Sequence, residues 1–342
     1  MIKKSLKSSK TQIGRGLDIG TAFIVCAEKK GQEVVFRSQR NAFFDIEHTD
    51  FTKQMLTKSK VNYIIQGKTL NVVGDEALKF ANLFSKEARR PLNKGVISPS
   101  EKEALPMVEL ILKTVIGRPR YPGEILYFSI PGNPLDADFD TVYHKNIFAG
   151  FLKKLGYKPK SIYEGLAVIF SELADENFTG IGISFGAGMV NVCLACMSVP
   201  VFTFSVTKAG DWIDRQVAKA LAETASRVCA IKENKLDLTK EKEVTKIEQA
   251  LSIYYDNLLD YVVENIIAEF ERSKKPSELD KPITIVLSGG STCPKGFLER
   301  FKQVLRKSDF PLAVGKVKMA AEPLLSVAKG ALVATLSDEE NK

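Results

Sequence analysis

Three glycine-containing turns, each following an apolar run, are the features of this sequence that could do chemistry. The turns contain Asp18, Gly20 and Thr21; Gly186, Ala187 and Gly188; and Gly289, Gly290 and Ser291. Glycine lets backbone N–H groups approach an anion closely, because no side chain stands in the way. Turns of this kind suit phosphate binding, although each one taken alone is also typical of an ordinary structural turn.

The first turn adds a carboxylate to this chemistry. Asp18 stands at the end of an apolar run, where it could hold a hydrated Mg²⁺ while the amides of Gly20 and Thr21 face phosphate oxygens. By itself a DxGT sequence is weak evidence for such a site. The order in which the turns occur along the chain therefore matters more than any one of them.

Cys193 and Cys196 form a CxxC motif, which could bind a metal or be structural. They lie in an apolar run that reads as a strand, where a separation of three residues directs side chains to opposite faces. The two histidines are far away in sequence. We therefore expect buried structural cysteines rather than a metal site.

The turns must be positioned by central strands. Apolar strand-like runs alternate with helical patterns, which indicates an α/β fold. The runs at 13–27 and 180–197 resemble one another, because each breaks at a tight glycine turn and then resumes, and this suggests a duplicated fold. The longest predicted helix covers residues 242–273, where apolar residues recur at steps of three or four.

Length and composition fit a folded protein with more than one core. The chain has 342 residues, of which 44% are hydrophobic and 26% charged. No apolar run approaches the roughly 20 residues that span a bilayer, and the start of the chain lacks the apolar part of a secretory signal, so we expect a cytoplasmic protein.

The net charge is +8, and lysines crowd the first ten residues. Elsewhere acids are mixed among the bases without aromatic stacking residues, so no specific nucleic-acid partner is expected. We expect residues 1–12 to be a flexible, solvated basic tail. Weak, salt-sensitive contact with anionic lipid is the alternative, and direct membrane contact stays open.

Taken in order, these features resemble the superfamily of actin and the heat-shock-chaperone ATPases over residues 14–336. The matching features are the DxGT turn, a strand ending at Ile130 and Pro131, a helix with Glu164, the second glycine hairpin and the late SGGS turn. Residues 90–97 resemble MreB-type bacterial actins, residues 72–77 and 207–211 are similar to the magnetosome actin MamK, and residues 321–331 resemble the last conserved helix of both. The chain is thus most similar to bacterial actins.

This resemblance implies a duplicated ribonuclease-H-like α/β fold. It would have two domains with a nucleotide cleft between them, and each domain would carry a smaller subdomain. The implied ranges are 13–45, 94–163 and 320–342 for domain IA; 46–93 for subdomain IB; 164–207 and 246–319 for domain IIA; and 208–245 for subdomain IIB.

The resemblance also implies ATP or ADP with Mg²⁺ in the cleft. Asp18, Gly20 and Thr21 would hold phosphate and metal, Asp18 through water, and Gly186, Ala187 and Gly188 would clamp the same phosphates. The base would pack against Gly289, Gly290 and Ser291. The ribose and adenine would be reached by Lys232 and Glu233, and the same site would include Gly210 and Asp211.

Glu164 would be catalytic with Asp18, orienting the attacking water. As a first-turn acid, Glu164 could instead serve the helix dipole.

Three residues depart from the family pattern. Ser184 stands where the second phosphate hairpin normally begins with a metal-binding aspartate, Met189 replaces a threonine, and Phe23 replaces a polar residue. Losing one carboxylate removes a full charge from a divalent cation site. We therefore expect nucleotide binding with slow or absent hydrolysis.

The resemblance favours a protein that assembles with itself into ATP-dependent filaments, to position or segregate a cargo, with a cargo or membrane adaptor protein as a further partner. A non-polymerising nucleotide-binding adaptor of a division or pilus-type machine is the main alternative. A chaperone would carry a separate substrate domain, and a sugar kinase would show a base for a substrate hydroxyl. Neither feature is found in this sequence.

Overall fold

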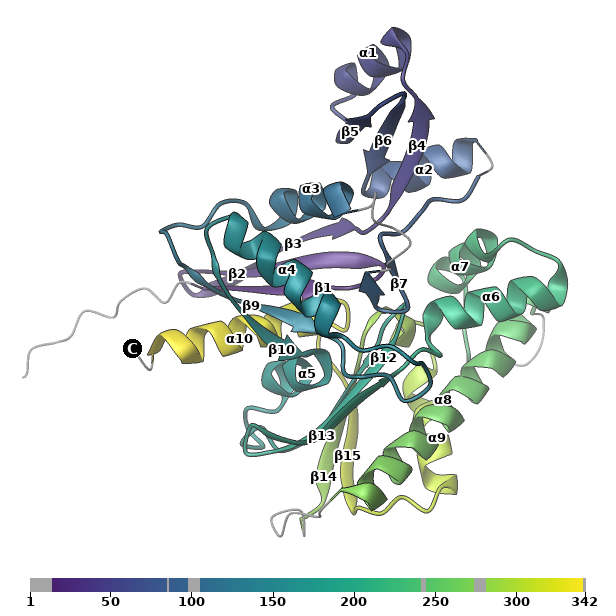
Figure 1. Cartoon of the computed structure of the whole chain (residues 1–342). Helices are drawn as coiled ribbons and strands as arrows, with labels where there is room; N and C mark the ends of the chain where they lie inside the picture. The colour runs from purple at the N-terminus through teal and green to yellow at the C-terminus, as the bar shows by residue number, and fades with distance from the viewer. Residues whose placement is uncertain (1–13, 85, 98–104, 241–243, 274–280, 341–342) are drawn as a thin grey trace, which may run out of the picture.

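The computed structural model describes residues 14–84, 86–97, 105–240, 244–273 and 281–340, and its elements form two large sheets (Figure 1). Sheet I has the strand order β10, β9, β1, β2, β3. Its strands are β1 (Arg15–Ile19), β2 (Phe23–Lys30), β3 (Glu33–Arg40), β9 (Ile125–Ile130) and β10 (Lys158–Tyr163).

Sheet II repeats this arrangement with the order β13, β12, β11, β14, β15. In both sheets the central strand pairs antiparallel with its hairpin partner and parallel with its other neighbour. The strands are β11 (Gly180–Phe185), β12 (Val190–Cys196), β13 (Val199–Val206), β14 (Ile283–Ser288) and β15 (Val314–Met319). The two predicted glycine hairpins and the duplication of the fold are confirmed.

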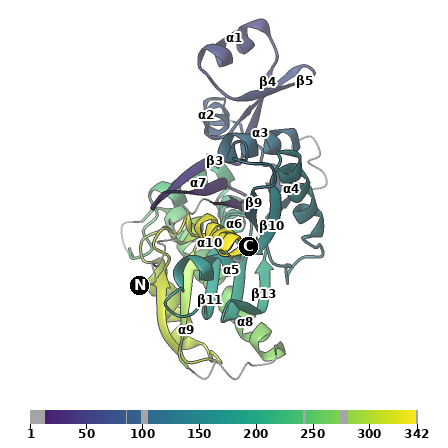
Figure 2. The ribbon, with the colours of Figure 1, turned by 90° about the vertical axis from the view of Figure 1, so that its left-hand side faces the viewer.

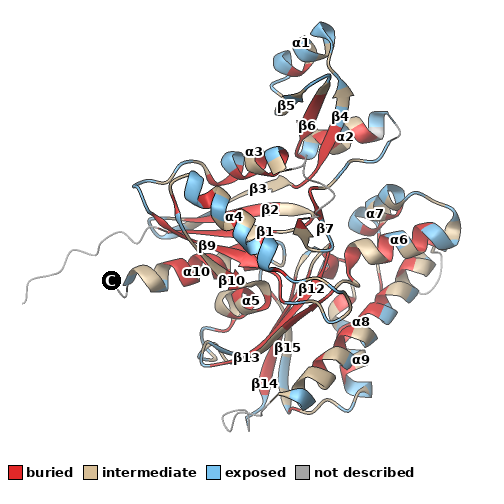
Figure 3. Cartoon of the chain, in the orientation of Figure 1, coloured by how far each residue is buried: buried red, intermediate tan, exposed pale blue. Residues whose placement is uncertain are grey.

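Two helices lie between the sheets: α5 (Glu164–Glu172) and α10 (Ser326–Glu340). Their backbones touch, because a Cβ atom added at Gly330 would lie 1.8 Å from the carbonyl oxygen of Ala167. With helices on both faces, β11, β12 and β14 are buried along their whole length, as the red colour of β12 and β14 shows (Figure 3). This is why their sequences are apolar throughout instead of alternating.

Two pairs of helices cover the outer faces of sheets I and II. The first pair, α3 (Leu105–Ile116) and α4 (Val142–Lys154), packs on sheet I. The second pair, α8 (Lys246–Arg272) and α9 (Phe297–Lys307), packs on sheet II, next to α6 (Gly210–Leu221) and α7 (Ala225–Asn234). The short 3₁₀ helix η3 (Gly290–Thr292) follows β14.

A smaller sheet stands apart from the two large ones and is reached from β3 (Figures 1 and 2). It comprises β4 (Phe43–Glu47), β5 (Tyr63–Gln66) and β6 (Thr69–Val73), with α1 (Asp50–Lys58) and α2 (Asp75–Leu83). A short pair, β7 (Leu92–Asn93) and β8 (Val96–Ile97), leads back to sheet I. Most of this small sheet falls within 46–93, and the assigned domain boundaries stay a prediction.

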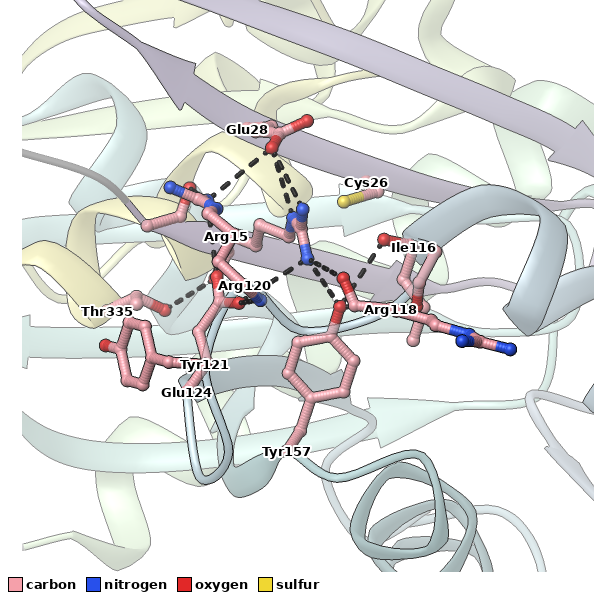
Figure 4. Close-up of polar contacts among 12 residues, drawn as sticks. Arg15, Cys26, Glu28, Ile116, Arg118, Arg120, Tyr121, Glu124, Tyr157 and Thr335 are labelled. Carbon is pink, nitrogen blue, oxygen red and sulfur yellow. Dashed lines mark hydrogen bonds and ion pairs between the residues drawn. The ribbon is translucent and has the colours of Figure 1, made fainter.

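Strand β1 is anchored at its first residue by a buried ion-pair network (Figure 4). Arg15 Nη2 lies 3.1 Å from Glu28 Oε1, and Arg15 Nη1 lies 3.5 Å from Glu124 Oε2. Burial alone would raise the pKa of Glu28. The positive charges of Arg15, Arg37 and Arg120 outweigh this effect and lower the pKa of Glu28 below its usual value. Because breaking such a pair leaves an uncompensated buried charge, the network fixes the strand that ends at Asp18.

Other expectations are met in part. The predicted helix 242–273 is α8, which begins at Lys246 because Thr245 and Glu248 form a capping box. Cys193 and Cys196 are buried, free cysteines on β12, as expected for a strand. The basic tail, residues 1–12, lies outside the described residues. Across the described parts of the chain, no helix is both long and apolar enough to cross a membrane.

Candidate functional site

A cavity of about 310 Å³ lies between the β1–β2 and β11–β12 hairpins. It brings together segments that are far apart in the sequence, from Asp18 to Val327. All predicted site residues except Gly210 line it: Asp18, Gly20, Thr21, Glu164, Gly186, Ala187, Gly188, Asp211, Lys232, Glu233, Gly289, Gly290 and Ser291. Its volume is at the lower end of the range of small-molecule sites.

The two hairpin turns have the same internal geometry. Gly20 N donates to Phe23 O and Gly186 N donates to Met189 O, both at 2.9 Å. The turns also meet at their tips, because a Cβ atom at Gly188 would lie 2.3 Å from Thr21 Oγ1 and 2.5 Å from Gly95 N. Only glycine permits this approach, which directs the backbone of both turns toward one small volume.

Asp18 and Glu164 face this volume from opposite sheets. Ser129 Oγ donates to Asp18 Oδ1 at 2.8 Å, and Ser184 Oγ donates to Glu164 Oε2 at 3.1 Å. The loss of contact with water raises the pKa of Asp18 to about 6. The same desolvation, together with the charge of Asp18, raises the pKa of Glu164 to about 8. Two carboxylates arranged in this way favour a cation between or beside them.

These residues fit a hydrated Mg²⁺ rather than a metal held by protein ligands alone. Among the residues the structure describes, no group of three or more His, Cys, Asp or Glu side chains is placed to hold a metal. Mg²⁺ usually keeps several waters and is bound through one or two carboxylates and the phosphates of its nucleotide. Asp18 could supply such a carboxylate, whereas the second hairpin has the Ser184 hydroxyl at the corresponding position.

The raised pKa values of Asp18 and Glu164 predict that the nucleotide-free protein loses stability as pH rises from about 4 to 8. Their pKa values increase on folding, from 3.8 to about 6 for Asp18 and from 4.5 to about 8 for Glu164. The stabilisation is therefore complete below the unfolded values and is lost as pH passes the folded values. Thermal melts from pH 4 to 8.5 should show the decline, with a smaller slope for Glu164→Gln. Equal slopes for the two proteins would contradict the assignment.

Lys232 and Glu233 of α7 also line the cavity, and both already have partners. Lys232 Nζ donates to Asp214 Oδ2 at 2.7 Å and to Gly210 O at 2.9 Å. Glu233 Oε2 accepts from Arg40 Nη2 at 3.3 Å. The charge of Lys232 is balanced by Asp214, and the contacts of Lys232 and Glu233 with ribose and adenine stay a prediction.

The start of α6 supports the second hairpin. Gly210 N donates to Gly186 O at 3.1 Å and Asp211 N donates to Ala187 O at 2.7 Å. Gly210 lies behind Ser291, since a Cβ atom there would be 2.6 Å from Ser291 Oγ. These amides are therefore occupied, and Asp211 reaches the cavity by its side chain.

Several residues at this site were missed. Arg90 Nη1 pairs with Asp211 Oδ1 at 2.6 Å across the mouth of the cavity, although Arg90 begins the segment that resembles bacterial actins. Phe23, already noted as a departure from the family pattern, has its ring 4.4 Å from the Arg40 guanidinium, which explains an apolar residue at this position. Tyr255 also lines the cavity. Because Tyr255 belongs to the apolar stripe of α8, its spacing in the sequence does not indicate that it lines a cavity.

Comparisons with known proteins agree with this architecture. A protein-family model described as Volactin matches residues 13–335. The solved structure of a MamK double helical filament is similar at 18% identity, with a TM-score of 0.72, covering 94% of this chain and 97% of that one. MreB5 of Spiroplasma citri bound to AMPPNP is similar at 16% identity and a TM-score of 0.69, covering 97% and 98%.

A third structure, the ethanolamine utilization protein EutJ from Carboxydothermus hydrogenoformans, is similar at 15% identity and a TM-score of 0.54, covering 94% of this chain and 90% of that one. No curated protein matches the sequence. At these identities the likeness shows the fold, and it confirms the resemblance to actin-like proteins of the MreB and MamK kind.

Proposed function

This chain belongs to the Volactin family and has an actin-like fold, and from that premise we propose that it binds ATP with Mg²⁺ and assembles into filaments. One observation carries the proposal: two equivalent glycine hairpins from two equivalent sheets meet at one cavity that also holds Asp18 and Glu164. A nucleotide bound there would touch both halves of the protein. It would thereby favour one angle between them and couple nucleotide state to assembly.

The similar structures support both parts of the proposal. MreB5 of Spiroplasma citri has been solved with AMPPNP and with ADP, and MamK has been solved as a double helical filament. Filaments would need a head-to-tail contact between copies, because such an interface need not close into a ring. We place the protein in the cytoplasm, where the filament would position or segregate a cargo.

The test is sedimentation of the purified full chain with Mg-ATP, with Mg-ADP and with neither, followed by negative-stain microscopy of each pellet. Filaments that depend on nucleotide would support the proposal. A soluble monomer that binds Mg-ATP in every condition would favour a nucleotide-binding adaptor, since Ser184 and Met189 are compatible with binding without turnover. A chain that binds no nucleotide would refute both functions.

We further propose that hydrolysis is slow, because the second hairpin lacks its metal-binding carboxylate. In the family role, Glu164 would accept a proton from the attacking water, and here its Oε2 accepts from Ser184 Oγ. Bound Mg²⁺ would offset the charge of the phosphates.

Ser184→Asp is expected to raise steady phosphate release by about tenfold or more, because it returns a charge to the cation site. The same variant should melt at a lower temperature without Mg-ATP, since a third carboxylate then faces Asp18 and Glu164. Ser184→Ala is the matched control, because it removes the hydroxyl that donates to Glu164 without adding a charge. Phosphate release from the wild-type protein already comparable to that of ordinary bacterial actins would contradict slow hydrolysis.

A further inference from the structure

Tyr255 is a core residue with one unusual atom. It lies in the middle of α8, is 0% exposed, and is among the largest fully buried side chains. Its ring meets Phe297 edge to face, with centroids 6.0 Å apart, within the core of sheet II. A phenylalanine would fill the same space, so packing does not explain the hydroxyl.

The hydroxyl of Tyr255 has no hydrogen-bond partner among the residues that the structure describes. Buried phenol groups normally find one, because an unpaired buried polar group is costly. Burial raises the pKa of Tyr255 well above its usual value, and the nearby Asp214, Cys293, Cys229 and Glu233 raise it further. The phenol therefore stays protonated and can donate.

The side chain of Tyr255 lines the cavity described above. Cys229 and Glu233 of α7, and Cys293 directly after η3, line the same cavity as Tyr255. The residues that the resemblance assigns to the base and ribose, Gly290, Ser291, Lys232 and Glu233, belong to these same two elements. The unpaired hydroxyl thus belongs to the part of the cavity that would receive a base.

We propose that the Tyr255 hydroxyl donates a hydrogen bond to a ring nitrogen of adenine and so helps select ATP over GTP. The proposal rests on the nucleotide-binding function above. The protonated phenol offers a donor for a ring nitrogen of adenine, and the Glu233 carboxylate, which lines the same cavity, offers an acceptor for its amino group. Guanine carries a carbonyl oxygen where adenine has the amino group, and that oxygen would face a carboxylate.

Tyr255→Phe tests this by calorimetric titration with Mg-ATP, Mg-GTP and Mg-tripolyphosphate. We expect about tenfold weaker ATP binding, a smaller loss for GTP, and unchanged tripolyphosphate binding, because only the base contact is removed. Tyr254→Phe is the matched control. It changes the neighbouring tyrosine, which packs on Trp212 with centroids 5.5 Å apart and does not line the cavity.

Thiol labelling gives a second readout that does not depend on turnover. Cys293 is exposed and lines the cavity beside η3, whereas Cys26, Cys193 and Cys196 are buried. ATP should protect Cys293 of the wild-type protein, and Tyr255→Phe should need about ten times more ATP for the same protection.

The possible outcomes distinguish a failure of the Tyr255 contact from a failure of the proposed ATP binding. A folded Tyr255→Phe that binds ATP and GTP as the wild type does would overturn the inference and leave ATP binding intact. A wild-type protein that binds tripolyphosphate but discriminates neither base would also overturn it. If the variant does not fold, wild-type titrations with deaza analogues of ATP decide, since each replaces one ring nitrogen by C–H. No loss with any analogue would refute the contact, whereas no binding of ATP at all would refute the proposed function.

Discussion

Asp18→Asn is expected to weaken Mg-ATP binding by about 10- to 100-fold, the range found when a residue that supports a bound metal is changed. Asp18 is the carboxylate placed at the end of β1 among the hairpin amides, and Ser129 already orients one of its oxygens. Asparagine keeps the shape but removes the charge that a hydrated Mg²⁺ requires. The nucleotide-free variant should be at least as stable as wild type above pH 6, because a desolvated charge is gone.

Titration with Mg-ATP and with ATP in EDTA measures this effect, since only the Mg²⁺-dependent part of the affinity should fall. Asp260→Asn serves as the control, because Asp260 is an exposed carboxylate on α8 that does not line the cavity. Unchanged Mg-ATP affinity in folded Asp18→Asn would remove Asp18 from the site.

Gly188→Ala should separate the two hairpins and lower ATP affinity by at least tenfold. Its new methyl group would lie 2.5 Å from the backbone nitrogen of Gly95 and 2.3 Å from Thr21 Oγ1. A backbone atom cannot rotate away, so the hairpins must move apart, and overpacking of this kind costs about 1–3 kcal/mol. The variant should therefore also melt at a lower temperature.

Gly150→Ala is the matched control, because Gly150 is exposed on α4 and a Cβ atom there meets nothing within 4 Å. This change should raise the free energy of unfolding by about 0.5–1 kcal/mol and leave ATP binding unchanged. Wild-type ATP affinity in Gly188→Ala would show that contact between the turns is not needed for binding.

Much of the fold could be predicted because its central strands are buried on both faces. Their runs are apolar throughout and stop at glycine turns, which made both hairpins recognisable without any knowledge of pairing. The start of α8 could also have been found, since Thr245 and Glu248 have the spacing of a capping box. The strand order of the sheets became predictable only through the family resemblance.

Side-chain partners across the site could not be predicted, because they depend on packing between distant segments. Lys232 and Asp214 come from α7 and α6, and their pairing requires the two helices to meet at a particular rotation. Tyr255 sits in a regular apolar stripe, so nothing in its spacing marks a hydroxyl that faces a cavity. Arg90 and Asp211 are separated by 121 residues and meet only when the cavity mouth is formed.

The backbone contact between α5 and α10 also has a mechanical consequence. With no side chains between Ala167 and Gly330, the two helices can roll on each other but have little room to slide. Such a contact would act as a hinge between the half of the protein that contains sheet I and the half that contains sheet II. A rotation too small to disturb the core at this contact would become a larger displacement at the small sheet of β4, β5 and β6, which lies far from it (Figure 1).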